Sequence, residues 1–153
     1  MALRFNKVLV NTRESDHYCT PKDFYDKVNK EFKFDFDPCP LRCDTFNGLE
    51  VEWHGNVYVN PPYSHVEAWI EKGINEIQKG NAKKIVYLIP LRTDSWYWHN
   101  KILAFSKEVR LVRGRLRFGD KKDLAPFGVA LIVFDELLNG EAKLLSYEAR
   151  CVS

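Results

Sequence analysis

The middle of the chain places a strand pattern, a rigid proline pair and a helix pattern in immediate succession, and this order limits the possible folds. Val57-Tyr58-Val59 is rich in β-forming residues and stops at Asn60-Pro61-Pro62-Tyr63. A helical pattern follows, and its apolar face consists of Val66, Trp69, Ile70, Gly73, Ile74 and Ile77. Residues 84–89 then form an apolar run typical of a buried parallel strand. The order predicts a β-α-β unit in a sheet covered by helices.

Similar patterns on either side extend this unit. Thr20-Pro21 predicts a helix start with Thr20 as the N-cap, and residues 34–37 alternate as a short strand would. Thr93 or Asp94 begins a third predicted helix that runs to about Phe105. Further strands are predicted at residues 109–112, 115–118, 129–134 and 143–147. We therefore expect one α/β domain over residues 1–153, with a mainly parallel sheet and antiparallel strands at one edge.

Composition excludes several classes of protein. The chain has 153 residues, of which 45% are hydrophobic and 29% are charged. Such a chain buries a core of its own, which argues against disorder. No apolar run is long enough to cross a bilayer, and residues 1–7 lack the apolar segment of a signal peptide. We expect no membrane partner and a cytoplasmic location.

The four cysteines are Cys19, Cys39, Cys43 and Cys151. In a chain without an export signal we expect reduced thiols rather than disulfides. The spacing of Cys39 and Cys43 suggests zinc, but no second pair of ligands follows, so no metal is expected.

Positive charge is concentrated late in the chain, although the formal net charge is only +2. Residues 107–122 contain seven basic side chains and two acidic ones. Arg113, Arg115 and Arg117 have the same parity, so one face of a strand would carry all three. Three like charges on one face favour a nucleic-acid phosphate partner, and the alternative is a merely solvated strand face.

Three predicted strands end in Asp37-Pro38, Asn60-Pro61 and Ile89-Pro90. Ligands of such sheets bind at the carboxyl ends of the strands, so we expect the chemistry where these ends converge. Two consecutive prolines fix the backbone and remove two donors, which leaves rigid carbonyls beside the amide oxygen of Asn60. These acceptors suit a planar amino group, and Tyr63 offers a ring for a flat ligand. A stiff turn with Tyr63 in the core is the alternative.

With these motifs in this order, the chain resembles the small phage-type DNA N6-adenine methyltransferases over residues 18–134. The matching segments are Thr20-Pro21, residues 34–39, Gly48-Leu49 with Trp53, Asn60-Pro61-Pro62-Tyr63 with Trp69, and residues 88–96, 114–118 and 125–127. The resemblance implies a minimal Rossmann-like fold and methyl transfer from S-adenosylmethionine to the exocyclic amine of adenine. It also implies a phage or prophage gene acting inside a bacterial host.

The resemblance assigns the catalytic role to Asn60, Pro61, Pro62 and Tyr63. Asn60 Oδ1 and the Pro61 carbonyl would accept the two N–H groups of the adenine amine and localise its lone pair. The base must leave the duplex to reach them, at a cost of a few kcal/mol. Tyr63 would stack on the base, and Phe118 or Phe127 would close its other face.

The cofactor residues implied by the resemblance lie around the methionine end of S-adenosylmethionine. They are Thr20, Pro21, Asp37, Pro38, Cys39 and Asn60, and Asp44 is a guess for the ribose. Asp37 at a strand end can pair with the cationic amino group, and a surface or N-capping acid is the alternative. Asp37-Pro38-Cys39-Pro40 stands where larger methyltransferases have a glycine-rich turn.

DNA contacts are expected from Tyr63, Phe118, Phe127 and a set of basic residues. That set is Arg92, Arg113, Arg115, Arg117, Lys121 and Lys122. Arg92, Thr93 and Asp94 could instead cap the third helix. All four tryptophans, Trp53, Trp69, Trp96 and Trp98, are expected in the core rather than on bases. The chain lacks an insertion for base recognition, so we expect a short recognition sequence or a second subunit in a homodimer.

Other functions stay open at this point. The same Asn-Pro-Pro-Tyr cluster serves methylation of glutamine amides in proteins, and RNA adenine is a further substrate of the same chemistry. A catalytically silent nucleic-acid-binding module is the alternative from another class, because the glycine-rich turn is missing.

Overall fold

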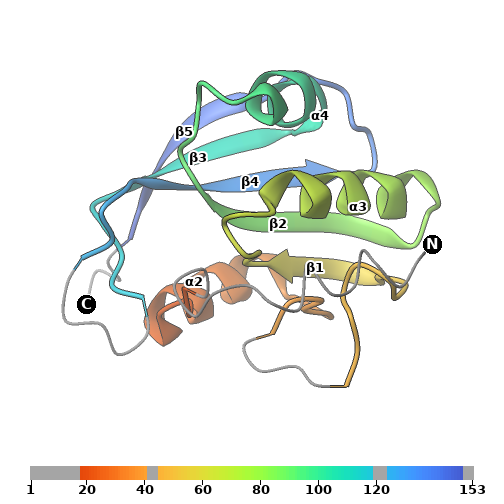
Figure 1. The fold of residues 1–153 in the computed structure, drawn as a ribbon, viewed down its shortest axis with the longest axis horizontal. Helices are drawn as coiled ribbons and strands as arrows, with labels where there is room; N and C mark the ends of the chain where they lie inside the picture. Colours follow the sequence, from red (N-terminus) through yellow and green to blue (C-terminus); the bar gives the residue numbers. More distant parts are fainter. Residues whose placement is uncertain (1–17, 41–44, 119–123, 150–153) are drawn as a thin grey trace.

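The structure is a computed structural model that describes residues 18–40, 45–118 and 124–149. Within these ranges, a five-stranded sheet has the order β1-β2-β4-β3-β5 (Figure 1). Its strands are β1 (Gly55–Val59), β2 (Ala82–Pro90), β3 (Glu108–Arg113), β4 (Val129–Asp135) and β5 (Lys143–Glu148). The helical segments are α2 (Lys22–Phe32), α3 (Val66–Gln78), the π-helical turn η2 (Trp98–Ile102) and α4 (Leu103–Phe105).

Four of the five described strands run in the same direction. β1 pairs in parallel with β2 and β3 pairs in parallel with β5, while β4 is antiparallel to both β2 and β3. The α/β class and the mixture of parallel and antiparallel strands are confirmed. The reversed strand lies at the centre of the sheet instead of at one edge, and the edge strand β5 is parallel to its neighbour. The carboxyl ends of β1, β2 and β3 therefore lie at the same edge as the amino end of β4.

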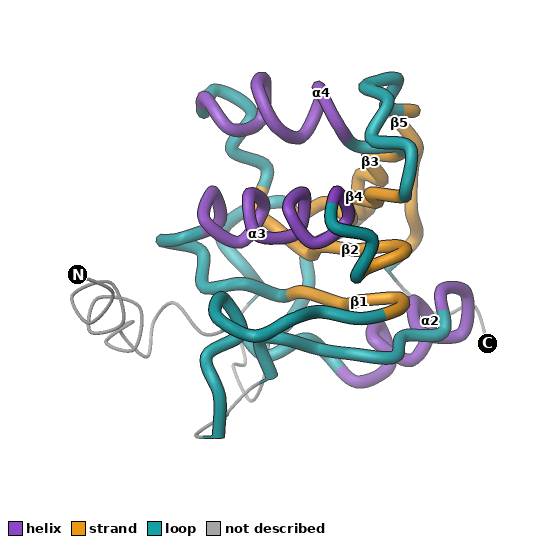
Figure 2. Tube along the Cα trace, turned by 90° about the vertical axis from the view of Figure 1, so that its right-hand side faces the viewer, coloured by secondary structure: helices purple, strands orange, loops and turns teal. Residues whose placement is uncertain are grey.

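Helices cover the two faces of the sheet, α3 and α4 on one and α2 on the other (Figure 2). The strands serve both faces because successive side chains point in opposite directions. Val57, Val59 and Tyr87 pack on the α3 side, whereas Tyr58 and Leu88 pack on the α2 side. The predicted apolar faces of both helices are buried; that of α2 consists of Phe24, Val28 and Phe32. Each fully buried aliphatic or aromatic side chain contributes about 1.5–3 kcal/mol.

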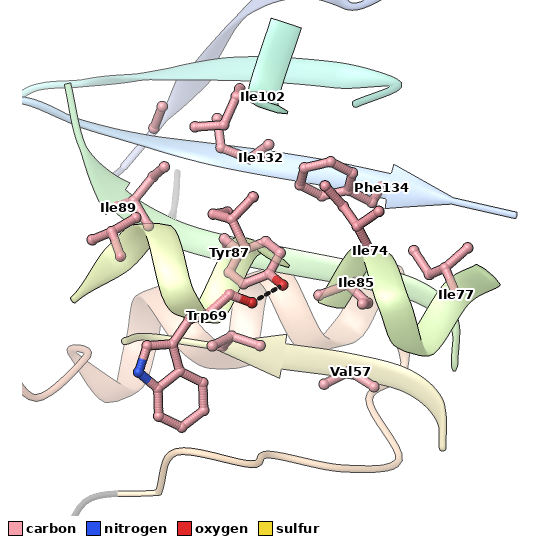
Figure 3. Packing of buried hydrophobic residues seen from close by; sticks show 14 of the residues in the cluster. Val57, Trp69, Ile74, Ile77, Ile85, Tyr87, Ile89, Ile102, Ile132 and Phe134 are labelled. Carbon is pink, nitrogen blue, oxygen red and sulfur yellow. Dashed lines mark hydrogen bonds between the residues drawn. The ribbon is translucent and has the colours of Figure 1, made fainter. Parts of the chain in front are cut away.

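One close approach fixes α3 on β2. The Tyr87 hydroxyl donates to the main-chain carbonyl of Trp69 at 2.8 Å (Figure 3). Gly73 lies one turn further along α3, and a Cβ there would stand 1.8 Å from the Tyr87 oxygen. The helix can approach the strand this closely only because residue 73 has no side chain. The helix after the Asn60 segment is thereby held on β2, and β1, which precedes that segment, pairs with the same strand.

Two predicted strands do not form, and the third predicted helix begins slightly later than expected but ends at Phe105 as predicted. Residues 34–37 form no strand; Phe36 makes a single parallel bridge to Val57, which still places Asp37 beside β1. Residues 115–118 continue from β3 as an irregular segment, because the chain must leave the sheet to reach the start of β4. The segment after β2 makes a turn at Thr93 and Asp94 before it becomes helical near Trp96, and it passes through η2 before α4.

Candidate active site

Asn60 directly follows β1, and hydrogen bonds hold its side-chain amide in one orientation. The amide nitrogen Nδ2 donates to the main-chain carbonyl of Tyr18 and, at 3.1 Å, to Thr20 Oγ1. A carbonyl can only accept, so the first bond identifies the NH2 end of the amide. The opposite atom, Oδ1, is buried and has no hydrogen-bond partner among the described residues. Buried acceptors are normally satisfied, so Oδ1 is available to a donor supplied by a ligand.

Thr20 supports this orientation from the start of α2. It was predicted to cap that helix, but Pro21 occupies the N-cap position, and no side-chain capping bond forms there. The Thr20 hydroxyl instead lies 2.7 Å from the hydroxyl of Tyr58, a buried residue of β1. The Tyr58–Thr20–Asn60 chain therefore ties the amide to the sheet.

The two prolines make the turn from β1 to α3 rigid. Both are buried, and the Pro62 carbonyl accepts a hydrogen bond of 3.0 Å from His65 N. That bond uses the Pro62 carbonyl inside the turn. Pro61 stays the predicted second acceptor beside Asn60 Oδ1.

A cavity of about 270 Å³ opens beside Asn60. It is bounded by the α2 start, the end of β1 and the segment after the Phe36 bridge. Its lining includes Thr20, Asp37, Cys39, Asn60 and Pro62, with Tyr18, Cys19, Lys22, Tyr25 and Tyr58 completing the wall. Asp37 and Asn60 thus lie at the same cavity, although residues 34–37 form no strand. The volume lies near the lower end of the range for small-molecule sites, about 300–1,000 Å³.

Asp37 and Cys39 form the turn that replaces a glycine-rich loop. Asp37 Oδ1 accepts a hydrogen bond of 2.9 Å from Cys39 N, which closes the turn around Pro38. Gly48 packs against the outside of this turn, where a Cβ would stand 1.9 Å from the Pro38 carbonyl oxygen. The Gly48 carbonyl in turn accepts a hydrogen bond from the indole of the buried Trp53. The turn is therefore braced from the core side.

The carboxyl group of Asp37 is electrostatically unusual. Burial raises its pKa to about 6, although the hydrogen bond from Cys39 N favours the ionised form. No Lys, Arg or His among the described residues forms an ion pair with it. Lys22 also lines the cavity, but its ammonium group pairs with Asp26. A half-buried carboxylate without an ion-pair partner is suited to a ligand that brings its own positive charge.

Tyr63 lies in a cluster of aromatic rings that includes Tyr18, a residue of the cavity wall. It is 4% exposed, and burial raises the pKa of its phenol, which therefore stays neutral. Its ring is stacked on that of Tyr18, with centroids 5.1 Å apart and planes 18° apart. Phe127 and Phe118 meet Tyr63 edge-on at 5.4 and 6.3 Å. Phe118 follows β3 and Phe127 precedes β4, so both rings lie near the carboxyl edge of the sheet. Their predicted role in closing the other face of a base stays a prediction.

The predicted phosphate-binding arginines lie on the surface. Arg92, Arg113, Arg115 and Arg117 are all exposed, but only Arg113 belongs to a strand, so the predicted single strand face was wrong. Arg113 forms an ion pair of 3.0 Å with Glu148, and Arg115 donates to the Ala125 carbonyl at 3.4 Å. The other predicted residues, Asp44, Lys121 and Lys122, lie outside the described residues.

Sequence reasoning gave no role to Tyr18 or Tyr58, which contact Asn60 and Thr20. The position of Tyr58 on the opposite strand face from Val57 and Val59 is a signal that could have placed it against α2. Tyr18 has no such local signal, because it precedes the first regular element. Trp53, Trp69 and Trp98 are buried as expected, whereas Trp96 is 58% exposed and does not belong to the core.

A cavity at the carboxyl ends of a largely parallel sheet, with helices on both faces, is the arrangement of Rossmann-like methyltransferases. None of the helices in the described ranges combines the length and apolar character needed to cross a bilayer. The chain belongs to the DNA N-6-adenine-methyltransferase (Dam) family, whose family model matches residues 7–151. No curated protein and no solved structure matches the chain.

Proposed function

We propose that this chain transfers a methyl group from S-adenosylmethionine to the N6 amine of adenine in DNA. The observation that carries the proposal is the buried, unpartnered Oδ1 of Asn60, which a hydrogen-bonded Nδ2 keeps in place. Membership of the Dam family supports adenine as the acceptor base.

The chemistry required of the protein is to make the adenine amine a better nucleophile. Its nitrogen lone pair is delocalised into the purine ring. When Asn60 Oδ1 and the Pro61 carbonyl accept its two N–H groups, the lone pair becomes more localised and can attack. The C–N bond then forms as the C–S bond breaks, its electron pair stays on sulfur, and the methylated nitrogen gives one proton to water. Fixed acceptors contribute through positioning and preorganised dipoles.

S-adenosylmethionine, when bound, supplies a methyl group on a sulfonium, which is a good leaving group. The cavity fits such a ligand chemically, because Asp37 offers a carboxylate without an ion-pair partner and the tyrosines offer apolar walls. In the proposal, Thr20, Asp37, Cys39 and Asn60 hold the cofactor directly. Pro21 shapes the backbone at the start of α2, and Pro38 shapes the turn between Asp37 and Cys39. Asp44 stays the predicted ligand of the cofactor ribose.

The adenine would reach Asn60 as an extruded base. Tyr63, Phe118 and Phe127 form the aromatic cluster on which it would stack, and such stacking contributes about 1–3 kcal/mol per base. The exposed arginines Arg92, Arg115 and Arg117 would contact phosphates around this edge, together with Arg113 and the predicted Lys121 and Lys122.

The test is to incubate the protein with methyl-labelled S-adenosylmethionine and, in parallel, adenine-containing DNA, RNA and a protein extract. Label on DNA that is recovered as N6-methyladenine after hydrolysis is expected. Label only on protein would favour glutamine methylation. Label only on RNA would show that the substrate is RNA and not DNA. Cofactor binding without any transfer would favour a silent binding module.

A further inference from the structure

Tyr18 covers one face of Tyr63, the ring on which the proposed base would stack. The two rings are stacked at 5.1 Å with an interplanar angle of 18°, close to the geometry of a stacked base. Tyr18 lies two residues before Thr20, the first of the proposed cofactor-binding residues. It also lines the cavity beside Asn60.

The other rings of the cluster enclose Tyr18 as well. Phe118 and Phe127 meet it edge-on, with centroids 5.2 and 5.4 Å away and interplanar angles of 70° and 84°. Tyr18 thus contacts the same three rings that were predicted to surround the adenine, one of them stacked and the other two edge-on. The atom predicted to accept from that adenine, Asn60 Oδ1, is at the same time shielded from solvent. In this arrangement the aromatic cluster has no room for a purine on that face of Tyr63.

We propose that the side chain of Tyr18 is a placeholder in the adenine subsite, and that it must rotate out before the extruded base can enter. This inference rests on the proposed function, because it assigns the subsite to the substrate of that reaction.

The contacts of Tyr18 permit such a rotation without loss of the Asn60 orientation. Asn60 Nδ2 bonds to the main-chain carbonyl of Tyr18 and not to its ring. Thr20 Oγ1 gives the same amide a second anchor. A change of the Tyr18 side-chain rotamer can therefore empty the subsite while the backbone continues to hold the catalytic amide.

A side chain that occupies the subsite lowers the apparent affinity of the protein for the extruded adenine. If only a fraction of molecules has the ring swung out, the measured affinity for the base falls by that fraction. Three ring contacts favour the closed state, so removal of the ring should raise base affinity about three- to thirtyfold. Tyr18→Phe keeps all three ring contacts and serves as the conservative control.

The experiment compares two short duplexes in the presence of S-adenosylhomocysteine, which cannot donate a methyl group. One duplex contains a single unpaired adenine, and the other has an abasic residue at that position. The ratio of their dissociation constants reports what the base contributes. For Tyr18→Ala this ratio should increase about three- to thirtyfold in favour of the adenine duplex, whereas Tyr18→Phe, which keeps the ring, should change the ratio less than Tyr18→Ala does. An unchanged or reduced ratio in Tyr18→Ala would overturn the proposal, since the ring would then be a wall or a stacking partner of the base.

A second measurement uses the wild-type protein and so does not depend on how the variant folds. Nitration of Tyr18 by tetranitromethane, located by peptide mass spectrometry, should become faster with the adenine duplex than with the abasic duplex. Equal or slower nitration would show that the ring stays in place and would overturn the proposal.

Methyl transfer to DNA, measured on the same wild-type preparation, separates this inference from the proposed function. Transfer together with a reduced ratio in Tyr18→Ala overturns the placeholder alone. An increased ratio without transfer to any nucleic acid supports the placeholder and contradicts the proposed reaction.

Discussion

The Asn60 amide nitrogen donates to the main-chain carbonyl of Tyr18, and this bond decides that Oδ1 is the atom left without a partner. The contact joins residues that are 42 positions apart in the sequence. It brings the segment before α2 onto the end of β1, where Thr20 adds a second acceptor for the same nitrogen. The orientation of the proposed catalytic group is therefore a tertiary property.

Replacement of Asn60 tests the role of that oxygen. Asn60→Ala should reduce methyl transfer at least a hundredfold, the usual cost of removing one preorganised hydrogen-bonding group, and leave DNA affinity nearly unchanged. Asn60→Asp keeps acceptor oxygens but loses the NH2 group that bonds to Tyr18. Its rate should therefore lie between those of the wild-type protein and Asn60→Ala. Single-turnover rates with labelled cofactor measure this order. A wild-type rate in Asn60→Ala would refute the mechanism.

Asp37 should make the free protein less stable at neutral pH. Its pKa rises from 3.8 in the unfolded chain to about 6 in the folded one, so the folded state binds the proton more tightly. The free energy of unfolding then decreases as pH rises through this interval and stays lower above it. Asp37→Asn should therefore add about 1–3 kcal/mol at about pH 7.5 and little at about pH 4. Urea unfolding at both pH values measures the difference; equal gains at both would exclude a titration effect.

The same carboxylate should make cofactor binding pH-dependent. The ionised form, which attracts a cationic amino group, becomes dominant as pH rises through about 6. Affinity for S-adenosylhomocysteine should therefore increase over this interval, and binding near pH 6 should release protons, because the ligand charge lowers the pKa of Asp37. Calorimetry in two buffers with different ionisation enthalpies measures the release. Asp37→Asn should bind more weakly with no such proton release, and a release that persists there would point to another group.

The exposed arginines should set the salt dependence of DNA binding. Arg115→Ala and Arg117→Ala should each reduce the slope of log affinity against log salt by about one, because each would remove one phosphate contact. Lys79→Ala is the matched control, since that exposed lysine follows α3 at the opposite end of the sheet. Fluorescence anisotropy over a salt series gives the slopes. Equal slopes for all variants would show that Arg115 and Arg117 do not contact DNA phosphates.

Gly73 should be intolerant of a side chain. Gly73→Ala would place a Cβ 1.8 Å from the Tyr87 oxygen and 3.0 Å from Ile85 Cδ1. Overpacking should outweigh the better helix propensity of alanine, for a net loss of about 1–3 kcal/mol. Asn75→Ala, at an exposed position of the same helix, should change stability by less than about 0.5 kcal/mol. Thermal unfolding of both variants checks the contrast, and equal melting temperatures would contradict the packing argument.

Much of the framework could be predicted because it depends on local patterns. The apolar face of α3, the strands around Tyr58 and Tyr87, and the rigid turn between β1 and α3 follow from periodicity and from the restrictions that proline imposes. Two of the predicted site residues, Asp37 and Asn60, converge because the parallel bridge from Phe36 to Val57 aligns the segment before Asp37 with the end of β1. The exposed Trp96 was missed, because a single position at the start of a short helical segment gives too little periodicity from which to infer burial.

The sequence by itself determined the types of the main helices and strands, the apolar faces and the position of the Asn-Pro-Pro-Tyr turn, because each depends on residues within one or two turns of chain. Only the tertiary structure decided that β4 enters the centre of the sheet, that Tyr18 stacks on Tyr63, and which end of the Asn60 amide is anchored. These relationships depend on non-local pairing and ring packing, where several arrangements satisfy the same local pattern and the packed core selects one.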